Sequence, residues 1–95
     1  MDAVDENRAQ LHRYREAIDA CDAELVRILA RRFAVTERVG QLKMRAGWPA
    51  VDERREAEQA QHIAVLAREQ GLDPEVALAV WRTIVDLVVQ RHREE

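Results

Sequence analysis

The amino-acid sequence predicts an all-α protein made of one long helix and two shorter ones. Glycine and proline are rare and gather mainly in two short stretches, 46–49 and 70–74, so little else interrupts a helix. In the first half of the chain, apolar residues recur every three or four positions over about 30 residues, as on one face of a helix. No segment shows the alternation with period two that predicts a half-buried strand.

The first helix is expected over about residues 6–46. At about 1.5 Å per residue, its apolar part alone spans about 45–60 Å, which is longer than a small domain is wide. We call this series of apolar positions the apolar stripe: Leu11, Tyr14, Ile18, Cys21, Leu25, Ile28, Val35, Val39 and Leu42. Nothing near Cys21 would activate a thiol, so we interpret it as a core residue.

The two shorter helices are expected over about 52–70 and 74–93. Gly71 suits the position after the end of a helix, and Asp73 and Pro74 suit the N-cap and first position of the next one. Together these helices offer apolar side chains to pack against the first: Ile63, Leu66, Val76, Val80, Trp81, Ile84, Val85, Val88 and Val89.

The length of the chain, 95 residues, predicts a single domain over 1–95 with a small core. A chain of this size buries only roughly 60–65% of its unfolded surface, and its one cysteine cannot form an internal disulfide. We therefore expect a homodimer, side by side or intertwined, in which the long helices contact each other and cover the apolar stripe.

The charge distribution argues against several classes of protein. Fifteen basic residues are balanced by 18 acidic ones, giving a net charge of −3, and no basic stripe or set of aromatic stacking residues predicts a nucleic-acid partner. No apolar run approaches the roughly 20 residues that cross a membrane, and the acidic N-terminus is unlike a signal peptide. We expect a cytoplasmic protein with neither nucleic-acid nor membrane partners.

Two cations stand where the helical pattern predicts inward-facing residues. Arg32 lies between Ile28 and Val35, and Lys43 follows 11 residues later in almost the same angular direction, about 16 Å along the axis. A buried guanidinium without an anion is costly. The pattern allows two interpretations: an anion lies between the two cations, or Arg32 pairs with an internal carboxylate while Lys43 extends to solvent.

Two further basic residues become candidate site residues only if an anion or a second chain lies nearby. Arg15 lies about 25 Å from Arg32 along the axis and roughly 100° around it, so only an antiparallel dimer brings Arg15 to the partner's Arg32–Lys43 region. Arg55 lies in the first turn of the second helix, where a cation is disfavoured, and shares a face with Asp52 and Glu56.

These residues together resemble the all-helical, AroQ-type chorismate mutases. The resemblance covers about residues 11–92 and is carried by short motifs: Tyr14-Arg15-Glu16-Ala17-Ile18-Asp19, Asp22, Leu25, Leu29-Ala30-Arg31-Arg32, Val39-Gly40-Gln41-Leu42-Lys43 and Pro49-Ala50-Val51-Asp52-Glu53-Arg54-Arg55-Glu56. It implies an intertwined helical homodimer, a role in the shikimate pathway of aromatic amino acid biosynthesis, and the concerted [3,3] rearrangement of chorismate to prephenate. No metal, nucleophile or cofactor is implied.

The resemblance also implies roles for individual residues. Arg15, from the partner chain, and Arg32 would hold the two substrate carboxylates, and Lys43 would donate to the ether oxygen and to a carboxylate. Such an arrangement suits the reaction, because preorganised donors meet the charge that develops on the breaking ether bond.

A second group of residues would surround the hydroxyl of the substrate ring. Asp52 and Glu56 would contact this hydroxyl, and Arg55 would line the same pocket. On the third helix, the family usually has a hydroxyl residue and, one turn later, a glutamine that donates to the ether oxygen. Here those positions are Val88 and His92, and we predict that His92 replaces the glutamine as donor.

Other functions remain open at this level. An aminodeoxychorismate mutase or an isochorismate-pyruvate lyase would use the same fold, and Asp52 and Glu56 could serve an amine as well as a hydroxyl. A non-catalytic helical dimerisation module, with Arg32 as a buried charge that fixes the register, is the alternative of another class. The other histidines, His12 and His62, lack metal-ligand spacing, and we expect them to face solvent.

Overall fold

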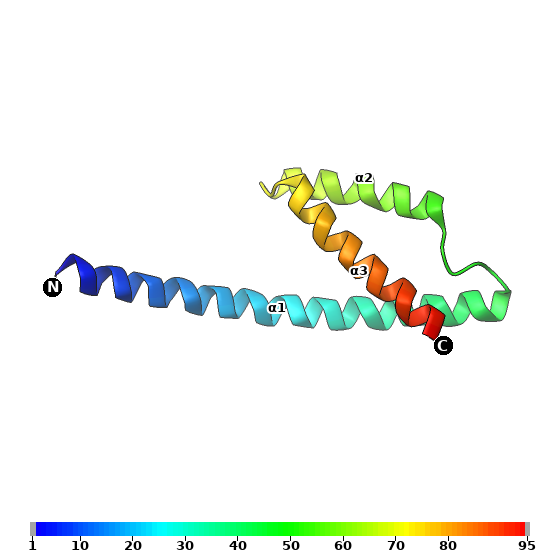
Figure 1. Cartoon of the computed structure of the whole chain (residues 1–95), viewed down its shortest axis with the longest axis horizontal. Helices are drawn as coiled ribbons and strands as arrows, with labels where there is room; N and C mark the ends of the chain where they lie inside the picture. Colours follow the sequence, from blue (N-terminus) through cyan, green and yellow to red (C-terminus); the bar gives the residue numbers. More distant parts are fainter. Residues whose placement is uncertain (1, 95) are drawn as a thin grey trace. The chain divides into compact units, whose positions relative to one another are not determined.

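The computed structural model describes the backbone of residues 2–94 and the side chains of residues 2–92. It contains three helices, α1 (Ala3–Ala46), α2 (Glu53–Glu69) and α3 (Pro74–Glu94) (Figure 1). The prediction of an all-α chain with one long and two shorter helices is therefore confirmed. None of the described helices is long and apolar enough to cross a membrane.

Two compact units divide the chain, and the boundary lies within α1. The first unit ends at Ala34 and consists of the first part of α1. The second unit begins at Val35 and contains the rest of α1 together with α2 and α3.

Glycine ends both α1 and α2 in the same way. Gly47 and Gly71 have φ angles of 72° and 71°, in the left-handed region that glycine adopts without a steric penalty. The next residue then bonds back to the helix, Trp48 to the Lys43 carbonyl at 2.9 Å and Leu72 to that of Ala67 at 2.8 Å. Both ends are Schellman motifs, and the prediction that Gly71 follows the end of the second helix is confirmed.

The turn between α2 and α3 is short because the N-cap of α3, Asp73, follows soon after the end of α2. The Asp73 side chain accepts a hydrogen bond from the backbone N–H of Glu75 at 2.9 Å, and Pro74 is the first residue of the helix. In the second unit, α2 and α3 form a helical hairpin (Figure 1).

The core of this hairpin is small. Ala67 of α2 and Trp81 and Val85 of α3 are its buried apolar residues, with relative exposures of 4%, 5% and 8%. Several of the expected packing residues, Leu66, Val76 and Val80, are instead exposed in the single chain.

The apolar stripe of α1 is likewise exposed. Its large members have relative exposures between 41% and 58%: Leu11, Tyr14, Ile18, Leu25, Ile28, Val35, Val39 and Leu42. Cys21 is exposed too. The interpretation of Cys21 as a core residue is therefore not met in the single chain.

Candidate active site

A small hollow lies in the second unit, between the end of α1, the turn that follows it and the last turns of α3. It is lined by Gly40, Lys43, Met44, Trp48, Ala50 and His92. Its volume of about 50 Å³ holds only a few water molecules. Two of the residues expected to contact substrate, Lys43 and His92, therefore line one hollow, although they lie far apart in the sequence.

Lys43 is positioned by the turn that ends α1. The backbone N–H of Trp48 donates to the Lys43 carbonyl, and the turn then brings Ala50 close enough to accept a 3.2 Å hydrogen bond from Lys43 Nζ. An ammonium group has three N–H donors. The bond to Ala50 thus orients the half-buried side chain and leaves two donors for a bound anion or ether oxygen.

His92 reaches the hollow from α3 and is anchored to α1. Its Nε2 lies 3.2 Å from the backbone carbonyl oxygen of Thr36. A carbonyl only accepts, so Nε2 carries the hydrogen, and the neutral ring has no hydrogen on Nδ1. While this bond holds, His92 can donate to a ligand through Nδ1 only as an imidazolium.

Gly40 makes room for this histidine. It is the buried residue of α1, and a Cβ at this position would lie 2.6 Å from His92 Nε2 and 2.9 Å from Cδ2. Any larger residue would push the ring off the helix. The close packing of His92 on Gly40 thus explains a glycine inside α1, although glycine costs roughly 1 kcal/mol of helix propensity relative to alanine.

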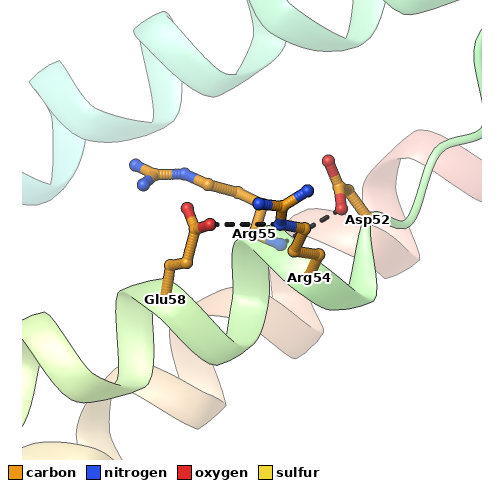
Figure 2. A network of polar contacts seen from close by, with 4 residues as sticks. All are labelled: Asp52, Arg54, Arg55 and Glu58. Carbon is orange, nitrogen blue, oxygen red and sulfur yellow. Dashed lines mark hydrogen bonds and ion pairs between the residues drawn. The ribbon is translucent and has the colours of Figure 1, made fainter.

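Asp52 and Arg55 lie at the start of α2. Asp52 is the N-cap, and its Oδ1 accepts a 3.1 Å hydrogen bond from the backbone N–H of Arg55. Figure 2 shows this bond together with the Arg54–Glu58 ion pair, 3.5 Å long, and shows the Arg55 guanidinium pointing away from the Asp52 carboxylate. The second carboxylate oxygen of Asp52, Oδ2, takes no part in the N-cap hydrogen bond. Arg55 is exposed.

Glu56 has a partner that the sequence did not indicate. Its Oε2 lies 3.9 Å from Nη1 of Arg82, and the Glu56 side chain is only 25% exposed. The Arg82 guanidinium also stacks 4.6 Å from the centre of the Trp81 ring, in the geometry of a cation–π contact. Nothing in the sequence links Glu56 to Arg82, because the packing of α3 on α2 brings them together from 26 positions apart.

Arg15 and Arg32 belong to the first unit. Arg15 is exposed and Arg32 is half-buried. No carboxylate among the described residues of that unit forms an ion pair with Arg32.

The remaining candidate residue, Val88, is half-buried and precedes His92 by one turn of α3. The other two histidines are exposed, as expected: His12 pairs with Glu16 on the surface of α1, and His62 lies on α2. Among the residues whose side chains are described, no three His, Cys, Asp or Glu residues are placed to hold a metal ion.

The fold and the hollow define an all-helical protein with an open basic site, where a lysine and a histidine from different helices line one space. A family model described as "Chorismate mutase type II" matches residues 14–93. The chain belongs to this family, which is a family of isomerases, and the resemblance noted from the sequence is confirmed. A search among curated proteins gave no match.

Proposed function

We propose that this protein is a chorismate mutase that rearranges chorismate to prephenate, and that two copies of the chain build each active site. The family implies chorismate mutase-type activity and chorismate as the substrate. The observation that carries the proposal is the hollow, since it brings Lys43 together with His92, the residue at the position of the usual glutamine donor.

The protein contributes to this rearrangement by positioning the substrate and by stabilising the charge that develops. The rearrangement breaks an ether C–O bond while a C–C bond forms, so the enolpyruvyl arm must be folded over the ring. Negative charge develops on the ether oxygen, and fixed donors lower the barrier by meeting it. In the proposed complex Lys43 and His92 donate to this oxygen, and the planar forks of Arg15 and Arg32 bind the carboxylates.

Two properties of the single chain support a shared site. The hollow of about 50 Å³ is too small to enclose a ring carrying two carboxylates. The apolar stripe is exposed along α1, and covering each half-exposed aliphatic side chain contributes on the order of 1 kcal/mol. An antiparallel second copy would cover the stripe and bring its Arg15 to the site, which completes the set of cations.

The residues at the start of α2 address the ring hydroxyl in this proposal. The hydroxyl has one hydrogen, which the Glu56 carboxylate accepts, while Asp52 and Arg55 contribute their charges nearby. Val88 offers an apolar wall where other members have a hydroxyl residue. It weakens ligand binding modestly, by the loss of one polar contact.

The direct test is to incubate the purified protein with chorismate, follow its loss, and identify the product. Isochorismate and aminodeoxychorismate are assayed in parallel, because the corresponding lyase and mutase use the same fold. Prephenate from chorismate supports the proposal, and turnover of only one of the other two substrates identifies the alternative enzyme.

A variant of Arg32 separates an enzyme from a dimerisation module. Arg32→Met should abolish turnover in an enzyme, because a carboxylate loses its bidentate partner. In a structural module the same change should stabilise the dimer, since it replaces a half-buried charge by an apolar side chain.

We predict that His92→Ala lowers kcat/KM for chorismate by about 10²-fold, the loss expected for one donor to the developing charge. The measurement is kcat/KM from initial rates of chorismate loss in the variant and the wild type.

The matched control for this prediction is His92→Gln, which restores the family's usual donor. Its side-chain amide carries two N–H donors, so this variant should keep activity. Full activity in His92→Ala would overturn the role of His92.

A further inference from the structure

Arg82 of α3 contacts both the Glu56 carboxylate of α2 and the buried Trp81 ring of the α2–α3 hairpin. Its Nη1 lies 3.9 Å from Glu56 Oε2, and its guanidinium lies 4.6 Å from the ring centre of Trp81. Trp81 is 5% exposed and therefore fixed by its packing. The stacking contact restricts the arginine, so its charge is held beside Glu56.

This pair differs from an ordinary surface ion pair in the same structure. Arg54 and Glu58 are neighbours one turn apart on α2, with side chains 91% and 56% exposed, whereas Arg82 and Glu56 come from two helices and are 50% and 25% exposed. Exposed pairs are screened by water and contribute little. The reduced exposure of Glu56 makes the neighbouring charge of Arg82 matter more for whatever Glu56 binds.

We propose that Arg82 is a positioning residue that sets the specificity of this site for a ring hydroxyl over a ring amine. The inference rests on the proposed function, in which Glu56 accepts a hydrogen bond from the substituent on the ring. Arg82 orients the Glu56 carboxylate and offsets its negative charge, and it does so without contacting the substrate.

The distinction between the two substituents is electrostatic. An amine on the ring is an ammonium ion near neutral pH, and it gains most from carboxylates whose charge is not compensated. A hydroxyl is neutral and needs only a well-placed acceptor oxygen. The positive charge of Arg82, 3.9 Å from Glu56 Oε2, offsets the negative charge of that carboxylate. An ammonium ion therefore gains less net attraction from Glu56 than it would from an uncompensated carboxylate.

The test compares kcat/KM for chorismate and for aminodeoxychorismate in four proteins: the wild type, Arg82→Met, Arg82→Lys and Arg54→Met. Methionine keeps an unbranched apolar stem over Trp81 and removes the charge, and lysine keeps the charge without the planar fork. Arg54→Met is the matched control, because it removes one arginine from an ion pair outside the site. Circular dichroism and thermal unfolding check that each variant is folded.

We expect the wild type to prefer chorismate, and Arg82→Met to lower the ratio of chorismate to aminodeoxychorismate kcat/KM by about fivefold or more. Arg82→Lys should hold the ratio within about twofold of wild type, and Arg54→Met should leave both values unchanged. An unchanged ratio in folded Arg82→Met, or an equal shift in Arg54→Met, overturns the role of Arg82 while the enzyme assignment stands. A wild type that turns over neither substrate overturns the proposed function itself.

Discussion

Replacing Lys43 by methionine is expected to lower kcat/KM for chorismate by about 10³-fold, the upper part of the range for removing one donor to a developing oxyanion. Lys43 lines the hollow beside His92, and its Nζ is already oriented by the Ala50 carbonyl. In the proposed complex, its charge meets the negative charge that develops on the ether oxygen. The measurement is the initial rate of chorismate loss at substrate concentrations well below KM.

Arg45→Met is the control for this variant. Arg45 lies two residues further along the last turn of α1, is exposed, and is not among the residues that line the hollow. Its removal changes the net charge by the same amount and should change kcat/KM by less than about twofold, as expected for an exposed charge outside the site. Lys43→Met retaining more than a tenth of wild-type activity, with the fold intact, would contradict the assignment of Lys43.

The second large effect concerns sites shared between two chains. Arg15→Ala and Arg32→Ala should each be nearly inactive alone, because each removes the partner of a substrate carboxylate from every site. Equal amounts of the two variants, unfolded and refolded together, should recover about a quarter of wild-type activity. Random pairing makes half of the dimers mixed, and each mixed dimer has one complete site of two.

The control for subunit mixing combines Arg15→Ala with a chain that carries both substitutions. No pairing of these chains assembles a complete site, so activity should stay at the level of the single variants. Recovery in this control would indicate that the assay reports something other than shared sites. No recovery in the first mixture, despite dimers of the expected mass, would show that Arg15 acts within its own chain or not at all.

The fold was largely predictable because its signals are local. The two turns follow from Gly47 and Gly71, because glycine adopts the left-handed backbone without a steric penalty, and the N-cap at Asp73 follows from an equally local hydrogen bond. The position of Lys43 on one face of the first helix could be predicted because it depends only on sequence spacing. These features need no knowledge of which helices pack together.

Contacts between helices could not be predicted from the sequence in the same way. Nothing in the sequence singles out Arg82, because only the packing of α3 on α2 places it beside Glu56. A glycine inside a helix, as at Gly40, indicates only that something packs closely against it. The structure shows that this neighbour is the ring of His92, 52 residues later in the sequence. The hydrogen bond that fixes the His92 tautomer is made to the backbone carbonyl of Thr36. Every residue has such a carbonyl, so residue type does not predict this bond.

The exposed apolar stripe of α1 has a consequence for how this protein responds to dilution. In the proposed dimer, a chain whose small core is confined largely to the α2–α3 hairpin gains stability by association, so its melting temperature should rise with protein concentration. Activity per chain should fall at high dilution, because the proposed dimers dissociate and their sites lose Arg15. The concentration of the chain should then govern both the folded fraction and the active fraction.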